Sequence, residues 1–287
     1  MANLLDGKKI AAEIREEIKS AVAVLKTQNI TPKLSVVLIG SDPASVVYAK
    51  AKEKACANVG MDYELHVLPE TTPEDKTIAL IEKLNTDNNV HGILIELPLP
   101  KALNKEKIMA AVSPLKDVDG VHPINRGYIL SNSNGLFPAT PQSCIEILLR
   151  HNIDLKGKEV VLVGRGDTIG KPLVFMLLNQ DATVTVCHTK TTNLSAHTRQ
   201  ADIVIAAAGK AKMITADMLK PGAIVVDAGI NQSEDGICGD VDFKAAEKVA
   251  GAISPVPGGV GSLTTVLIQR NVLKAIALQK RTNGGNK

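Results

Sequence analysis

The strongest constraint on the fold is a short apolar run that ends in a glycine-bearing turn, VVLVGRGDTIGKP at residues 160–172. The run predicts a buried strand, and the segment Pro172–Leu178 predicts a helix. Many α/β proteins hold a dinucleotide pyrophosphate with a strand, a glycine-rich turn and a helix in this order, because the glycines admit backbone N–H groups and the helix dipole favours negative charge. Gly164, Gly166 and Gly170 are spaced one residue wider than the usual fingerprint, and such turns also occur without a ligand, so the match alone is weak.

The next apolar run indicates which dinucleotide binds. Ala182–Cys187 is β-branched and lies about 20 residues past the first glycine, where the second strand of a Rossmann-type domain is expected. NAD-selective sites end this strand with Asp or Glu to bind the ribose hydroxyl, whereas His, Thr and Lys follow Cys187 here. Arg165, Thr189 and Lys190 could instead surround a 2′-phosphate, which favours NADP; the alternative is that both cations are solvated surface residues.

Length and composition are typical of a cytosolic enzyme of two domains or of one large one. The 287 residues can bury substantial cores, and a net charge of +3 with 2% aromatic residues argues against a nucleic-acid surface. The four cysteines have no zinc-like spacing, so no metal site is predicted and reduced thiols are expected. We find no signal peptide and no apolar run near the ~20 residues of a membrane span. These features predict a cytoplasmic protein that acts on a small molecule, without membrane or nucleic-acid partners.

The N-terminal half alternates helices and strands. Short crossovers of this kind imply a parallel sheet with helices on both faces. Asp42 and Pro43 predict a helix start and Gly60 its end. The expected elements are a helix at residues 8–27, a strand at 34–39, a helix between Asp42 and Gly60, a strand at 63–68, a helix at 73–87 and a strand at 91–95.

A turn-rich stretch at residues 114–141 separates the two halves and predicts a boundary or a functional loop. Beyond it we expect a helix at 141–151, strands at 203–207 and 224–227, a loop at 255–262 and a final helix at 263–280. The predicted fold is therefore two α/β domains with parallel sheets and the active site in the cleft between them. Residues 1–140 form the first domain, onto which the C-terminal helix (263–287) packs, and residues 141–262 form the Rossmann-type domain.

Two polar residues follow the first predicted strand. Tyr48 and Lys52 are four residues apart, so they share one helical face near the carboxyl edge of the sheet, where α/β proteins bind ligands. The alternative is a solvated lysine, because composition does not distinguish Lys52 from Lys50 and Lys54.

Together with segments elsewhere in the sequence, these residues make the chain resemble the bifunctional methylenetetrahydrofolate dehydrogenase/methenyltetrahydrofolate cyclohydrolase family over nearly its whole length. The order and spacing of the matching segments are far more specific than any one of them. These segments are GSDPASVVYAKAKEKACANVGM, GILIELPLP, KDVDGVHPINRG, VGRGDTIGKP, ATVTVCHTKTTNL, KPGAIVVDAGIN and PVPGGVG.

The resemblance implies a role for each matching residue. Lys52 corresponds to the catalytic lysine, Tyr48 to a tyrosine that stacks on the folate, and Asp119 to the carboxylate that holds the pterin ring. It also implies substrate contacts from Pro257, Gly258 and Gly259, and cofactor contacts from Gly164, Arg165, Gly166, Gly170, Thr189, Lys190 and Ile230.

The implied reactions belong to one-carbon metabolism. Methylenetetrahydrofolate gives a hydride to NADP and becomes methenyltetrahydrofolate, which water then opens to formyltetrahydrofolate. The resemblance further implies a homodimer formed through the nucleotide-binding domains.

Several residues depart from the family pattern. Glu96 stands where the family has glutamine, and a carboxylate there would pair with Lys52 and favour its ammonium form, leaving less neutral lysine for the water step. Glu96 could instead be protonated or act as the base, or it could turn away without effect. In the phosphate-binding turn, Gly166 replaces serine, and Asp167 would weaken NADP binding if it pointed inward; such an Asp more often caps the following helix.

Three other functions stay open from the sequence. One is a dehydrogenase whose cyclohydrolase activity is weak or absent because of Glu96. Another is a folate- or nucleotide-binding protein without catalysis, and a third is a different two-domain dehydrogenase, such as one resembling shikimate dehydrogenase.

Overall fold

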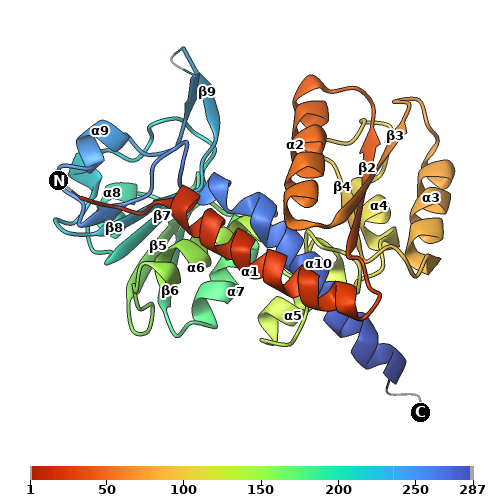
Figure 1. The fold of residues 1–287 in the computed structure, drawn as a ribbon. Helices are drawn as coiled ribbons and strands as arrows, with labels where there is room; N and C mark the ends of the chain where they lie inside the picture. The colour runs from red at the N-terminus through yellow and green to blue at the C-terminus, as the bar shows by residue number, and fades with distance from the viewer. Residues whose placement is uncertain (1, 235, 285–287) are drawn as a thin grey trace. The chain divides into compact units, whose positions relative to one another are not determined.

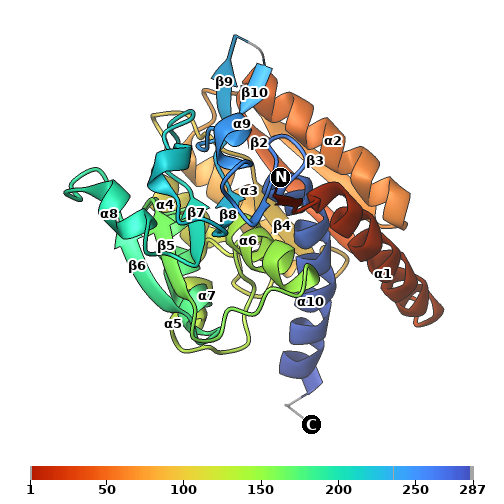
Figure 2. The ribbon, with the colours of Figure 1, turned by 90° about the vertical axis from the view of Figure 1, so that its left-hand side faces the viewer.

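The computed structural model describes residues 2–234 and 236–284, which form two compact α/β units (Figures 1 and 2). Met1–Ala12 group with Pro138–Thr264, and we call this the cofactor unit; Glu13–Phe137 group with Thr265–Lys287, and we call this the lysine unit. The first residues of the chain therefore belong with its second half. The boundary falls inside helix α1 (Gly7–Thr27).

The lysine unit is built on a parallel sheet in the order β3-β2-β4. Its strands are β2 (Lys33–Ile39), β3 (Asp62–Leu68) and β4 (Gly92–Ile95). The central strand β2 is almost wholly buried, as its continuous apolar run predicts. Helices α3 (Glu74–Thr86) and α4 (Lys105–Ala111) pack on one face of β2 and β4, while α2 (Pro43–Val59) contacts β2 and β3 (Figure 1).

The C-terminal helix α10 (Thr264–Gly284) is anchored on the lysine unit by side-chain amides. Asn271 donates from Nδ2 to the carbonyl oxygens of Val118 and Phe137, at 2.7 and 2.8 Å. Gln279 donates from Nε2 to the carbonyl oxygens of His91 and Leu115, both at 3.0 Å. These bonds hold α10 against the turn-rich stretch that ends the unit.

That turn-rich stretch contains a helix that the sequence analysis treats as loop. Helix α5 (Pro123–Leu130) begins after His122, whose Nδ1 accepts from the N–H of Ile124 at 3.1 Å. Proline in the first turn needs no donor, so Pro123 favours the helix start. The boundary expected in this stretch is present, because the two units divide between Phe137 and Pro138. The helix was not predicted, and a histidine cap and a first-turn proline together start it.

The cofactor unit is built on a six-stranded sheet in the order β1-β11-β8-β7-β5-β6, in which each neighbouring pair is parallel. Its strands are β1 (Asn3–Leu4), β5 (Glu159–Val163), β6 (Thr183–Cys187), β7 (Ile203–Ala206), β8 (Ile224–Asp227) and β11 (Ala252–Ile253). Its helices are α6 (Ala139–Arg150), α7 (Gly170–Leu178), α8 (Leu194–Thr198) and α9 (Phe243–Ala246), with 3₁₀ turns at Ala216–Met218 and Val260–Ser262. An antiparallel hairpin, β9 (Asn231–Ser233) with β10 (Gly236–Cys238), extends from it (Figure 2).

The strand order of the cofactor unit indicates where a ligand site is expected. The chain leaves β5 for β6 on one side and later returns to β7 on the other side of β5. Open α/β sheets bind ligands at such a switch point, outside the carboxyl ends of the strands. The prediction of two α/β units with parallel sheets, the second of Rossmann type, is confirmed.

Candidate functional sites

In the lysine unit, helix α2 carries Tyr48 and Lys52. Asp42 caps the helix by accepting from the N–H of Ser45 at 2.9 Å, and Gly60 closes it, as predicted. The Lys52 ammonium lies 5.8 Å from the centre of the Tyr48 ring, so the two side chains do share one face. Tyr48 is 54% exposed and offers a free ring surface to a planar ligand.

Glu96 lies directly after strand β4 and faces Lys52. Lys52 donates from Nζ to Glu96 Oε1 at 2.6 Å, and the two side chains are only 14% and 10% exposed. Ser45 donates from Oγ to the carbonyl oxygen of Leu97 at 3.2 Å, which ties the start of α2 to the loop after β4. The predicted pairing of Glu96 with Lys52 is confirmed, and the alternative in which Glu96 turns away is wrong.

Asp119 lies in the KDVDG segment beside this ion pair. Desolvation raises the pKa of Asp119 to about 7, the negative charges of Asp117 and Glu96 add to the rise, and Lys52 opposes it. Asp117 is itself fixed by bonds from the N–H of His122 at 2.8 Å and from Asn125 Nδ2 at 2.9 Å. The structure therefore brings Tyr48, Lys52, Glu96 and Asp119 into one neighbourhood.

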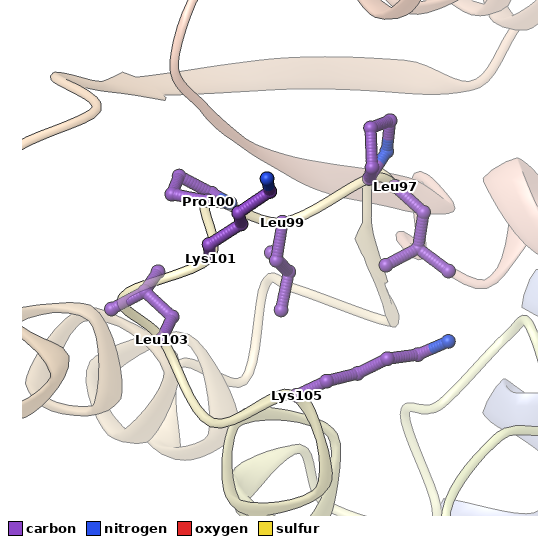
Figure 3. Close-up of a pocket in the computed structure, with 7 residues that line it drawn as sticks. Leu97, Leu99, Pro100, Lys101, Leu103 and Lys105 are labelled. Carbon is purple, nitrogen blue, oxygen red and sulfur yellow. The ribbon is translucent and has the colours of Figure 1, made fainter.

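A hollow adjoins this neighbourhood, with a volume of about 390 Å³ (Figure 3). It is lined by Leu97, Pro98, Leu99, Pro100, Lys101, Leu103 and Lys105. Lys105 is close enough for its charge to act on Asp119 and lower its pKa. No sequence signal separates Lys105 from its lysine-rich surroundings, because its position depends on the path of the loop after β4.

In the cofactor unit, the turn between β5 and α7 contains the glycines that the sequence singles out. A Cβ on Gly164, whose φ is +135°, would overlap the carbonyl oxygen of Ala207. A Cβ on Gly170 would lie 2.6 Å from Arg165 Cα, whereas one on Gly166 would meet no described atom within 4 Å. Gly164 and Gly170 thus allow close backbone packing, and Gly166 leaves open space at the turn, as a phosphate-binding corner requires.

The residues after β6 lie at the same sheet edge. Thr189 and Lys190 are exposed, as is Arg165 in the first turn. His188 organises this loop, because its N–H donates to Thr191 Oγ1 at 2.8 Å and its Nδ1 accepts from the N–H of Lys190 at 3.2 Å. The loop therefore offers a cation and a hydroxyl toward solvent.

Asp167 does not occupy the N-cap position of helix α7. That position is Ile169, whose side chain makes no capping bond. Asp167 instead pairs with Lys171, one helical turn further on, at 2.6 Å between Oδ1 and Nζ.

The remaining predicted residues also lie in the cofactor unit. Ile230 is 59% exposed after β8, and its Cδ1 lies 3.9 Å from where a Cβ on Gly261 would be. Pro257, Gly258 and Gly259 form the loop after β11, and the carbonyl oxygen of Gly259 lies against Gly7 at the start of α1. The structure thus gathers the substrate-loop candidates with the dinucleotide candidates in one unit.

Two buried carboxylates of this unit were not singled out from the sequence. Asp227 and Asp240 are 3% and 0% exposed and accept several backbone N–H bonds each. The segment GDVD contains Asp240, but the three backbone N–H groups that it binds after β7 lie 30–32 residues earlier in the chain. The local sequence pattern therefore does not predict that these two carboxylates are buried and bound by backbone N–H groups.

Family models match both parts of the chain. The family model for the tetrahydrofolate dehydrogenase/cyclohydrolase catalytic domain matches residues 5–119, and that for the family's NAD(P)-binding domain matches residues 138–280. The chain is similar to the "Bifunctional protein FolD" of Pelotomaculum thermopropionicum, with 65% identity over 97% of this chain and 99% of the relative.

Solved structures give the same result. The chain is similar to a bifunctional methylenetetrahydrofolate dehydrogenase/cyclohydrolase from Campylobacter jejuni, with a TM-score of 0.95, 44% identity, and coverage of 97% of this chain and 100% of that one. It is also similar to the Trypanosoma brucei enzyme complexed with NADP and an inhibitor, with a TM-score of 0.91, 33% identity, and coverage of 98% and 99%.

These matches span both units and do not favour a dehydrogenase of another family, a dehydrogenase-only enzyme or a non-catalytic binding protein. The chain belongs to the tetrahydrofolate dehydrogenase/cyclohydrolase family.

Proposed function

We propose that this enzyme uses NADP to oxidise 5,10-methylenetetrahydrofolate to 5,10-methenyltetrahydrofolate and then hydrolyses that product to 10-formyltetrahydrofolate. The observation that carries the proposal is the Lys52–Glu96 ion pair of 2.6 Å, set beside Tyr48 and Asp119 in a chain of this family. The catalytic residues are Lys52 and Glu96, and the folate-binding residues are Tyr48 and Asp119.

In the oxidation step, positioning of the folate supplies most of the catalysis, because the bound NADP itself accepts the hydride. The exposed Tyr48 ring provides a surface on which a pterin or aminobenzoyl ring can stack. The pKa of about 7 at Asp119 leaves its carboxyl partly protonated near neutral pH, so it can donate to as well as accept from the polar edge of a pterin.

In the hydrolysis step, a water molecule attacks the methenyl carbon and must lose a proton. Pairing with Glu96 favours the ammonium form of Lys52, so the carboxylate of Glu96 is the group of this pair that can take the proton, in a place that is mostly shielded from solvent. Glu96 accepts the proton, either directly or through Lys52. The bond between the former methenyl carbon and N5 then breaks as the carbinol proton passes to N5, and the formyl group stays on N10.

The cofactor unit fits NADP. Gly164, Gly166 and Gly170 form the pyrophosphate-binding turn, where Gly166 leaves open space. The exposed Arg165, Thr189 and Lys190 are placed to bind the 2′-phosphate, and no carboxylate follows β6 at residues 188–190 to select the ribose hydroxyl of NAD. Ile230 contributes an apolar contact to the cofactor, and Pro257, Gly258 and Gly259 contribute backbone to the substrate side.

We further propose that the lysine unit acts as the folate domain and the cofactor unit as the NADP domain, with the first residues of the chain in the latter, and that the enzyme works as a cytoplasmic homodimer. Free cysteines, three of them buried, are consistent with a reducing compartment. The described residues contain no helix long and apolar enough to cross a membrane. Sedimentation equilibrium of the purified protein tests the dimer, and a single species of monomer mass at micromolar concentration would exclude it.

The function is tested by two assays on one purified sample. One follows methylenetetrahydrofolate oxidation with NADP and with NAD, and the other follows methenyltetrahydrofolate hydrolysis above its spontaneous rate. We expect both reactions, with NADP preferred over NAD. Absence of both reactions would exclude the proposal, and oxidation without hydrolysis would establish a dehydrogenase only.

The Glu96→Gln variant tests the role of the ion pair. If Glu96 takes the proton, hydrolysis falls about tenfold or more while oxidation changes less. A faster hydrolysis would contradict this role and show that the carboxylate restrains Lys52. Glu53→Gln makes the same chemical change at an exposed position of helix α2 and serves as the matched control.

A further inference from the structure

The loop that follows strand β7 is held by one buried carboxylate. Asp240 Oδ2 accepts from the N–H groups of Ala208 and Gly209 at 2.6 and 2.9 Å, and its Oδ1 accepts from the N–H of Lys210 at 2.9 Å. Asn231 adds a bond from Nδ2 to Oδ1 at 2.9 Å. Three successive backbone N–H groups that converge on one point form an anion-binding nest, and here the anion is part of the chain.

This loop lies where a dinucleotide is expected. It follows β7, next to β5 in the sheet, and the β5–β7 pair marks the switch point of the strand order. The two loops at this point touch, because the carbonyl oxygen of Ala207 occupies the space that a Cβ on Gly164 would need. Any shift of residues 207–210 therefore changes the packing against the phosphate-binding turn at Gly164.

A second carboxylate fixes Asp240 itself. Asp227 accepts from the N–H groups of Asp240 and Val241 at 3.0 and 2.9 Å, and from that of Gly229 at 2.9 Å. Gly239 packs so closely on Asp227 that a Cβ there would overlap its carboxylate. Asp227, at the end of β8, thus fixes the backbone of Asp240. The Asp240 side chain in turn fixes the loop after β7 through its hydrogen bonds to that loop.

We propose that Asp240 is a positioning residue for NADP: its carboxylate fills the nest at residues 208–210, fixes one wall of the dinucleotide crevice, and leaves the phosphates to the turn at residues 164–170. This inference rests on the proposed function, because it names a residue that supports the cofactor site of that reaction. Asp240 does not touch the cofactor and takes no part in the chemistry.

The Asp240→Asn variant tests the proposal with a built-in comparison between two reactions. Replacing one carboxylate oxygen by an NH₂ group sets a donor against a backbone donor and releases part of the loop. We expect the KM for NADP in oxidation and the dissociation constant for NADP by calorimetry to rise about tenfold, with a smaller change in kcat. Hydrolysis, which consumes no NADP, should stay within about twofold of wild type. Asp242→Asn removes the same charge two residues away and should change neither reaction.

A second variant decides the question if Asp240→Asn does not fold. Gly209 has a φ of +65°, and a Cβ there would meet no described atom within 4 Å, so Gly209→Ala strains the loop without crowding the core. We expect it to weaken NADP binding about threefold or more and to spare hydrolysis. Wild-type NADP affinity in the folded variants, or equal losses in both reactions, would overturn the proposal. Absence of both reactions in the wild type would instead exclude the proposed function, while calorimetry with NADP would still test Asp240.

Discussion

Each unit of this enzyme contains buried carboxylates, but the two units use them differently. In the lysine unit, Glu96 faces the ammonium of Lys52, and Asp119 lies within the field of several charges. In the cofactor unit, Asp227 and Asp240 are bound mainly by backbone N–H groups. Paired side chains can exchange protons during a reaction, whereas amide-bound carboxylates hold backbone in place. The first arrangement suits chemistry and the second suits a rigid binding site.

The largest expected effect is a loss of hydrolysis without a loss of NADP binding, which would separate the catalytic role of the first group of carboxylates from the structural role of the second. Lys52→Met removes the cation of the first cluster and should lower hydrolysis by about 10²–10⁴-fold, because proton transfer to or from a positioned side chain contributes about that much. The calorimetric affinity for NADP should not change. Lys54→Met on the same helix is the matched control, since Lys54 is exposed. Retained hydrolysis in Lys52→Met would mean that the Lys52–Glu96 ion pair is structural. The carboxylates of the two units would then not differ in function.

The next effect concerns how the first cluster responds to pH. Because the pKa of Asp119 is raised to about 7, the folded state holds this proton more tightly than the unfolded chain, so Asp119 makes stability fall as pH rises from about 4 to 7. Three pKa units correspond to at most about 4 kcal/mol, and partial exposure reduces the effect. Asp119→Asn should therefore flatten the decline in urea midpoints between pH 5 and pH 8. An unchanged slope, equal to that of exposed Asp75→Asn, would contradict the raised pKa.

A smaller effect tests the rigidity of the second cluster. Gly239→Ala forces a methyl group against the Asp227 carboxylate, and overpacking of this kind costs about 1–3 kcal/mol. Chemical denaturation should show that loss. Gly127→Ala in helix α5 meets no described atom within 4 Å and should be neutral or slightly stabilising. If Gly239→Ala is as stable as wild type, the backbone around Asp227 and Asp240 can move to make room for a methyl group, and this part of the cofactor unit is not rigid.

The smallest effect concerns thiol reactivity. Burial raises the pKa of Cys56 to about 11 and that of Cys144 to about 12, so neither thiol is ionised at pH 8, although Lys52 lowers the first somewhat. Cys238, which is partly exposed, should react with a disulfide reagent well before the other three. Equally fast labelling of Cys56 would show that the surroundings of Lys52 open more readily than the core near Cys144.

Sequence reasoning predicted what depends on local pattern. The buried strand β2 follows from a continuous apolar run, and the limits of α2 follow from Asp42, Pro43 and Gly60. The pairing of Glu96 with Lys52 was also predictable, because the family match puts these side chains together. In each case the determining residues lie within one element or one motif.

What sequence reasoning missed depends on distant parts of the chain. Strands β1 and β11 have two residues each and exist only because they pair with other strands. Asp240 binds three backbone N–H groups of a loop that precedes it by thirty residues or more. Helix α5 was missed for a different reason, since its cap is a histidine and not one of the usual capping residues.

The pairing of β1 with β11 also bears on how the enzyme is made. Asn3 is synthesised long before its partner in the sheet, Ala252. The lysine unit waits as well, because α10, which supplies Asn271 and Gln279, is made after the other described helices. Neither unit can complete its contacts until these late segments have been made, so the nascent chain exposes unfinished sheet edges and core surface until then, which favours reliance on cellular chaperones during synthesis.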